Sequence, residues 1–104
     1  MEVLVFHLGG HRYGLHLDAV SEVQAAVRVT PLPAAPSVVE GIIDVRGRLA
    51  AVFDLRQRFR LPPCPPRPSE RIVLATAGTR LVAFRCDRVS GLVFVDASTL
   101  EDPR

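Results

Sequence analysis

The chain of 104 residues has no tryptophan and only two cysteines, Cys64 and Cys86. No stretch approaches the roughly 18 apolar residues of a membrane-spanning helix, and the opening residues, MEVLVFHLGG, lack the basic leader of a secretion signal. Two cysteines without metal-ligand spacing predict free, inert thiols in a reducing compartment. These absences exclude a secreted disulfide scaffold and direct membrane insertion, and they predict a soluble cytoplasmic protein.

Lysine is also absent, so all thirteen basic residues are arginine, beside eleven acids and a net charge of +2. Coding bias in a GC-rich genome produces this usage, and so does selection for planar pairing with carboxylates or phosphates. The arginines are scattered, which favours bias. Aromatic residues make up only 6% of the chain, whereas a barrel that binds single-stranded nucleic acid needs aromatic platforms beside its cations. A small arginine-rich β-barrel that binds single-stranded nucleic acid is our alternative interpretation. The preferred interpretation, developed below, expects no nucleic-acid partner.

The length fits a single domain, which we assign to residues 1–104. Hydrophobic residues are 48% and charged residues 23% of the chain, as in ordinary soluble proteins. The segment LPPCPPRPS has five prolines in nine residues and cannot form the interior of a sheet. It predicts a connector at about 61–69 between a first half, about 1–60, and a second half, about 70–98, followed by a short tail.

Residues 3–17 alternate apolar and polar side chains on either side of Gly9–Gly10, a dipeptide that tolerates the positive φ of a tight turn. This pattern predicts a hairpin in which Phe6 faces Tyr13 and Leu4 faces Leu15. One face of the hairpin then collects the apolar side chains of Leu4, Phe6, Leu8, Tyr13 and Leu15.

Asp18 stands where a helix N-cap would, before AVSEV, so we predict one short helix carrying Val20 and Val23 after the first hairpin. Prolines at three positions then predict an extended crossing: Pro31, Pro33 and Pro36. Two further hairpins are expected, one turning at Arg46–Gly47 with its second strand running on through Leu55, and one turning at residues 77–79.

The two halves share one pattern: a strand, a glycine turn, a second strand, an aspartate and a valine-serine pair. The correspondence matches Asp18, Val20 and Ser21 with Asp87, Val89 and Ser90. The first half continues into the hairpin with Arg46–Gly47, for which the second half has no counterpart. If the halves are related, the second lacks two strands.

The sequence gives little support for a catalytic site or a metal-binding site. Strand alternation places His7 and His16 on one face and His11 at a turn on the other, so the three imidazoles do not converge on a metal. Asp44 and Asp54 flank a hairpin without an accompanying nucleophile or phosphate loop. We therefore expect a protein that is not an enzyme, with no catalytic residues, no bound metal and no cofactor.

The stretch VVEGIIDVRGRLAAVFDLRQRF is the most informative part of the sequence. Its Gly41, the turn Asp44–Val45–Arg46–Gly47 and the strand end Asp54–Leu55–Arg56 resemble the pattern of the CheW-like chemotaxis coupling proteins. LVFHLGGHRYGLHLDAVSEV, with Glu22 in a valine-x-glutamate position, and RLVAFRCDRVSGLV resemble other parts of that family. The chain departs from the pattern at Asp44, where asparagine is usual, at Ala51, where proline is usual, and in lacking the last hairpin.

The resemblance implies an all-β fold of two small SH3-like five-stranded barrels, one of them incomplete here. It implies an adaptor that couples the cytoplasmic tip of a methyl-accepting chemoreceptor to a CheA-type histidine kinase. The implied partner-binding residues are Val20, Glu22, Gly41, Arg46, Gly47 and Val89. Core packing of the two valines and a fold-holding ion pair between Glu22 and Arg46 are the structural alternatives. A missing hairpin would fit a minimal form, a homodimer or strand exchange, or a decayed gene product.

Overall fold

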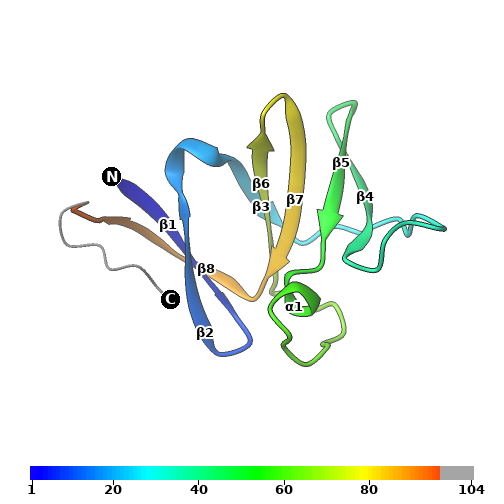
Figure 1. Cartoon of the computed structure of the whole chain (residues 1–104), viewed down its shortest axis with the longest axis horizontal. Coiled ribbons are helices and arrows are strands. Elements are labelled where there is room, and N and C mark those ends of the chain that lie inside the picture. Colours follow the sequence, from blue (N-terminus) through cyan, green and yellow to red (C-terminus); the bar gives the residue numbers. More distant parts are fainter. Residues whose placement is uncertain (97–104) are drawn as a thin grey trace.

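The computed structural model describes residues 1–96, which form two antiparallel-rich β-sheets (Figure 1). The elements in chain order are β1 (Glu2–Leu8), β2 (His11–His16), the 3-10 helix η1 (Leu17–Ala19), β3 (Val20–Ala25), β4 (Val39–Val45), β5 (Arg48–Phe53), α1 (Leu55–Arg58), β6 (Arg71–Ala77), β7 (Arg80–Cys86) and β8 (Arg88–Phe94). The small sheet has the order β2-β1-β8, and the large sheet β3-β6-β7-β5-β4. The all-β prediction is confirmed.

The first hairpin adopts the predicted register. Phe6 pairs with Tyr13 and Leu4 with Leu15, and Leu4 and Phe6 are buried. The predicted turns at Arg46–Gly47 and near Gly78 are also present, since Val45 pairs with Arg48 and Ala77 with Arg80. Alternation of apolar residues about a glycine turn was therefore enough to locate all three hairpins.

The predicted helix carrying Val20 and Val23 is wrong, because these residues belong to strand β3. Only Leu17–Ala19 is helical, as a single 3-10 turn, and the side chain of His16, not that of Asp18, accepts a backbone N–H at its start. Exposure along β3 alternates with a period of two, and the strand pairs with β6. This distant pairing overrides the local helical spacing of the valines.

The strand predicted to run on through Leu55 ends at Phe53 instead. The Asp54 side chain accepts the backbone N–H of Gln57 at 3.2 Å and caps helix α1, while the Arg58 N–H bonds to the Asp54 carbonyl. Aspartate is among the best N-cap residues because its carboxylate satisfies a free N–H of the first turn. The predicted strand through Leu55 did not take this cap into account.

The two halves of the chain are related by a constant spacing. The pairs Leu4–Leu15 and Phe6–Tyr13 of the first hairpin correspond, 69 residues later, to Val73–Phe84 and Ala75–Val82 of the β6–β7 hairpin. Each hairpin passes its third strand to the other sheet: β3 pairs with β6, and β8 pairs with β1. Both of these exchanges have a register shift at the corresponding place. The two halves of the chain, which share a sequence pattern, therefore also share the same strand pairing and register.

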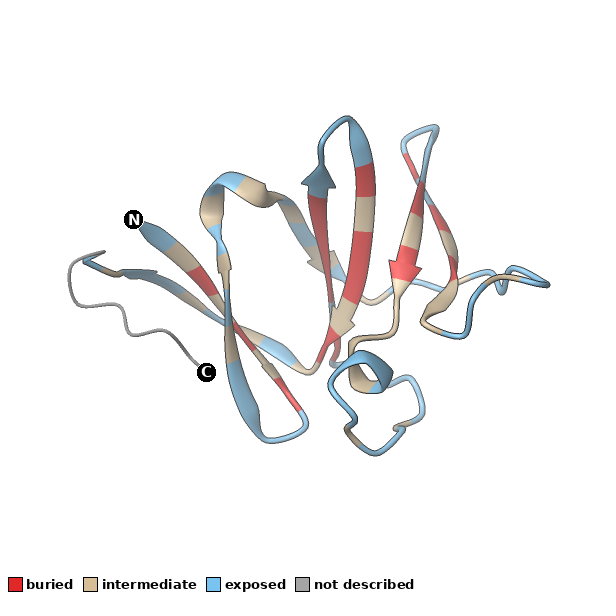
Figure 2. Ribbon diagram, viewed as in Figure 1, coloured by how far each residue is buried: buried red, intermediate tan, exposed pale blue. Residues whose placement is uncertain are grey.

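Two apolar clusters hold the fold, and the buried positions are concentrated in the large sheet (Figure 2). The interior of the large sheet contains Ile43, Val45, Ala50, Val52, Ile72, Leu74, Leu81 and Ala83. The cluster between the sheets contains Leu4, Phe6, Val73, Phe84 and Cys86. Thr30, beyond the end of edge strand β3, exchanges two 2.9 Å backbone hydrogen bonds with Ile42 of the opposite edge strand β4. The large sheet therefore closes on itself.

Candidate functional site

The residues predicted to bind partners lie in three places. Glu22, Arg46 and Gly47 meet at one rim of the large sheet, where β3 faces the β4–β5 turn. Val20 and Val89 lie at equivalent positions of the repeat, beside the cluster between the sheets. Gly41 is separate, buried in β4 beneath the segment that carries Thr30. The structure therefore brings together one charged pair and one valine pair, and leaves Gly41 apart from both.

Glu22 and Arg46 form the expected ion pair. The Arg46 guanidinium donates from Nη2 to Oε1 of Glu22 at 2.6 Å and from Nη1 to Oε2 at 3.4 Å. The hydrogen bond from Arg46 lowers the pKa of Glu22, and in turn Glu22 raises the pKa of Arg46. The Arg46 side chain is 73% exposed, so solvent screens the pair and its contribution to stability is small. The pair joins strand β3 to the β4–β5 turn at the surface.

A shallow pocket of about 160 Å³ lies beside this ion pair. Its lining combines the charged groups of Glu22, Arg46 and Arg48 with Leu74 and Leu81 from the interior of the large sheet. The main chain turns sharply at this rim, with positive φ at Arg46 and Gly47, and the Asp44 carboxylate accepts the Gly47 N–H at 2.7 Å. The arrangement offers a partner a small pocket of mixed polar and apolar lining, with oriented charges around it.

Val20 and Val89 are both half-buried and pack against the cluster between the sheets. Val20 pairs with Ala75 and Val89 with Phe6, at matching points beside the two register shifts. Core packing therefore explains why part of each valine side chain is buried. Their role toward a partner stays a prediction.

Close backbone packing explains why glycine stands at position 41. A Cβ at this position would lie 2.1 Å from the carbonyl oxygen of Thr30, far inside the contact distance. Only glycine lets the Thr30 segment approach and close the large sheet. Gly47 differs, because its surroundings are open and its φ of +88° is what favours glycine.

A charged cluster that was not predicted from the sequence fastens the connector. Asp87 accepts the Arg56 and Arg67 guanidinium groups, both at 2.6 Å, and the Gly9 backbone N–H at 2.9 Å. Burial raises the pKa of Asp87, but the Gly9 N–H and the two arginines outweigh it and leave the pKa lowered. The repeat offers no hint of this cluster, because the corresponding Asp18 is 92% exposed and contacts His16.

A second cluster continues the first along the connector. Glu70 is 1% exposed and accepts the Arg85 guanidinium at 2.7 Å and the Arg67 N–H at 3.2 Å, while Arg85 also reaches Glu40 at 2.8 Å. A glutamate two residues before the apolar run Ile72–Ala75 was the available signal. Both clusters join elements of the fold to one another, and we assign them a structural role.

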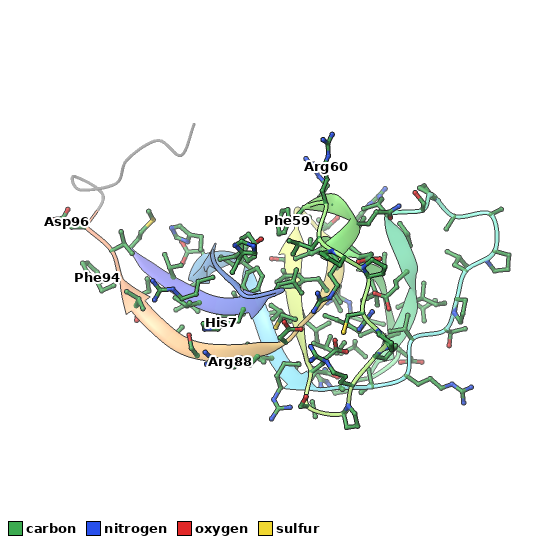
Figure 3. The ribbon with its side chains drawn as sticks, turned by 90° about the horizontal axis from the view of Figure 1, so that it is seen from below. His7, Phe59, Arg60, Arg88, Phe94 and Asp96 are labelled. Atoms are coloured by element: carbon green, nitrogen blue, oxygen red, sulfur yellow. The ribbon has the colours of Figure 1, made fainter. Side chains whose placement is uncertain are left out.

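The histidines and the flanking aspartates are placed as the register predicts. His7 pairs with Arg12 of β2 and with Arg88 of β8, and Figure 3 shows His7 and Arg88 near one another. Desolvation, Arg88 and Arg12 together lower the pKa of His7. These cationic neighbours disfavour a metal ion. Among residues 1–96, no three His, Cys, Asp or Glu side chains gather as metal ligands. Asp44 and Asp54 each bond a backbone N–H of their own turn or helix, which gives both carboxylates a structural task.

Two free cysteines and a group of stacked aromatic rings lie among the described residues. Cys64 and Cys86 are free, and burial raises the pKa of Cys86 to about 11, so it remains a neutral thiol. The Tyr13 ring stacks between Phe6 and Phe59, at 5.6 Å and 4.7 Å. These rings pack on one another rather than forming an open platform. None of the helices within residues 1–96 has the length and apolar character to cross a membrane.

Comparison with known proteins gives one consistent result. The family model for the CheW-like domain matches residues 2–104. Chemotaxis protein CheW of Rhizobium meliloti is 29% identical over 94 residues, which cover 90% of this chain and 61% of that protein. Protein FrzA of Myxococcus xanthus is 28% identical over 102 residues, 98% of this chain and 64% of FrzA. The crystal structure of the scaffolding protein TtCheW from Thermoanaerobacter tengcongensis matches with a TM-score of 0.91 and 30% identity, over 98% of this chain and 70% of that one. The chain thus spans about three fifths of the length of these curated relatives.

Proposed function

Because the chain belongs to the CheW-like domain family, we propose that it is a chemotaxis-type signalling adaptor. It couples the cytoplasmic tip of a methyl-accepting chemoreceptor to a CheA-type histidine kinase. It works in the cytoplasm through protein contacts alone, without catalysis and without a cofactor. Catalysis belongs to the kinase, and the adaptor supplies fixed surfaces.

The observation that carries this proposal is the Glu22–Arg46 pair beside its pocket. A bidentate ion pair at an exposed rim contributes little to stability, but it orients a guanidinium next to the hollow lined by Leu74 and Leu81. Arginine is among the residues most enriched at the hot spots of protein interfaces. We propose that Glu22, Arg46 and Gly47 form one contact surface, and that Val20, Gly41 and Val89 contribute to a receptor-facing surface elsewhere on the molecule.

The test is the molar mass of the purified protein in solution, alone and mixed with the regulatory domain of a CheA kinase from the same genome. We expect a defined complex. Arg46→Ala should weaken this complex about tenfold or more, as for an interface hot spot. The thermal midpoint should hardly change, because the Arg46 side chain is exposed.

Arg28→Ala is the matched control, since Arg28 is also exposed and does not line the pocket beside the ion pair. It should bind as the unmodified protein does. The proposal fails if no complex forms, or if a folded Arg46→Ala variant binds as tightly as the unmodified protein.

A further inference from the structure

Two chain crossings join the sheets, and they are fastened differently. One crossing runs from β2 through η1 to β3, and the other runs from β7 to β8. Asp18 and Asp87 occupy corresponding positions in them. In the described part of the chain, the Asp18 carboxylate is 92% exposed and reaches only the His16 imidazole, at 3.6 Å. The Asp87 carboxylate is largely buried and binds groups from both halves of the fold.

The partners of Asp87 come from three separate segments. Its Oδ2 accepts the Gly9 N–H of the β1–β2 turn, and its Oδ1 accepts Arg56 of α1 and Arg67 of the connector. The Leu61 side chain packs on the same turn, since a Cβ on Gly9 would lie 3.0 Å from Leu61 Cδ1. One carboxylate therefore ties the turn of the small sheet to the helix and connector that follow the large sheet's β5.

The proline-rich connector is stiff and is fastened at both ends. Five prolines between residues 61 and 69 fix their own φ and restrict the residues that precede them. The Leu61 N–H donates to the Arg56 carbonyl at 2.7 Å, and Arg67 and Glu70 exchange hydrogen bonds at 3.2 Å and 3.0 Å. A stiff segment loses less conformational entropy than a flexible one when it places Arg67 against Asp87.

The apolar contact between the sheets is formed by a few side chains. Leu4 and Phe6 pack with the buried residues of the second hairpin, which are Val73, Phe84 and Cys86. Structural units that share a small interface move relative to one another unless something else holds them. Figure 1 shows the two crossings at opposite ends of the sheets, with the β7–β8 crossing beside α1 and the β1–β2 turn. The Asp87 contacts therefore hold one end, and the other end lacks their equivalent.

We infer that Asp87 and the proline-rich connector form a latch that sets the angle between the two sheets. Val20 and Val89 each follow one of the two crossings and pack beside the cluster between the sheets. A change of the sheet angle therefore changes the separation of these valines, and Asp87 is a positioning residue for them. The inference rests on the proposed function only for the role of the two valines toward a receptor.

Residual dipolar couplings of the backbone amides in a weakly aligned sample test the latch, because they report how β1–β2 is oriented relative to β6–β7. One alignment tensor should fit both hairpins of the unmodified protein. In Asp87→Asn, which keeps the side-chain shape and removes its charge, the couplings of β1–β2 should shrink relative to those of β6–β7. Asp18→Asn is the matched control and should keep the single tensor. A single tensor in Asp87→Asn would overturn the inference.

The connector is tested without touching a charged group. Pro65 and Pro66 are exposed, and replacing both by glycine should loosen the small sheet as Arg67→Gln does. Replacement of the exposed Pro31 and Pro33 by glycine is the matched control, because that segment does not reach Asp87, and it should keep the single tensor. If the Pro65→Gly, Pro66→Gly variant also keeps a single tensor, the connector has no part in the latch.

Binding separates positioning from general destabilisation. The probes are the cytoplasmic tip of a chemoreceptor and the regulatory domain of a CheA kinase, both from the same genome. Asp87→Asn should weaken the receptor tip about two- to tenfold, as expected when the competent sheet angle is only partly populated. It should leave the kinase domain bound, since the pocket beside Arg46 is lined by large-sheet residues.

The outcomes distinguish this inference from the proposed function. Unchanged sheet angles in Asp87→Asn, with both partners bound by the unmodified protein, would overturn the latch and leave the adaptor function in place. Loosened sheets with undiminished receptor binding would overturn the positioning role of Asp87. Loosened sheets in a protein that binds neither partner before mutation would support the latch and remove the proposed function.

Discussion

The large and small sheets are built from corresponding hairpins, yet their cores are not equally enclosed. Leu74 of β6 is 0% exposed beneath the β4–β5 hairpin, while Val5, its counterpart on β1, is half-buried. The same order of strands and the same register thus support two different packing states. Strand pairing alone therefore does not enclose a core in this protein. The β4–β5 hairpin, which covers the large sheet, completes the enclosure there.

The largest test of this comparison is a pair of matched truncations. Leu74→Ala should lower the free energy of unfolding by about 2–5 kcal/mol, because it leaves a cavity in an enclosed interior. Val5→Ala removes side-chain atoms that are already partly in water and should cost roughly 1 kcal/mol. Urea unfolding of both variants measures the difference, and equal losses would mean that the two sheets are equally enclosed.

Closure of the large sheet gives the second test. Gly41→Ala should cost about 1–3 kcal/mol, since the new Cβ must displace the Thr30 carbonyl. Hydrogen exchange at the Thr30 and Ile42 amides should accelerate. Gly78→Ala meets open space and only its φ of +65° opposes it, so this control should leave those two amides protected. Unchanged exchange in Gly41→Ala would argue against the closure.

The two corresponding aspartates give a third comparison. Asp87→Asn should cost about 1–2 kcal/mol, because charge-assisted hydrogen bonds to Arg56 and Arg67 are lost. Asp18→Asn should have almost no effect, since the Asp18 side chain is 92% exposed.

The pH dependence of Asp87 has a definite sign. Its pKa is lowered from 3.8 in the folded protein, so its stabilising contribution is present above that value and is lost as the pH falls through the folded pKa. Acid titrations of stability should therefore be flatter for Asp87→Asn than for Asp18→Asn. Identical acid profiles for the two variants would contradict the assignment.

The smallest expected effect concerns His7, whose counterpart in the large sheet, Thr76, does not titrate. Desolvation, Arg88 and Arg12 lower the pKa of His7 below 6.5, against the opposing charge of Asp87. The unfolded chain then binds more protons than the folded one, so stability should decline as the pH falls through 6.5 towards the folded pKa. His7→Gln should reduce that decline in thermal unfolding measured from pH 7 to pH 5, and a steeper decline would contradict the assignment.

Sequence predicted the hairpins because their signals are local. Alternation and glycine turns fixed the register of Phe6 with Tyr13, and the burial of Leu4 and Phe6 followed from it. Strand β3 was mistaken for a helix because its strand character depends on β6, far along the chain. Asp54 carried a local cap signal for α1 that the apolar pattern of the preceding strand obscured.

The candidate site was predictable only in part. The pairing of Glu22 with Arg46, 24 residues apart, followed from the family resemblance and is present. The reason for glycine at position 41 was not visible, because it depends on where the Thr30 segment crosses. The Asp87 cluster was equally hidden, since its arginines come from a helix and a connector whose placement no local pattern specifies.

The pairing of β8 with β1 also bears on how the chain is made. Met1 and Val95 exchange backbone hydrogen bonds, and Glu2 pairs with Phe94, so the small sheet is assembled from residues near both ends of the described chain. Such non-local pairing slows folding because a long loop must close first. During synthesis, the first hairpin emerges from the ribosome well before β8 is translated. One edge of β1 therefore stays unpaired until β8 is available. We expect this interval to be when the nascent protein is most exposed to aggregation and most in need of a chaperone.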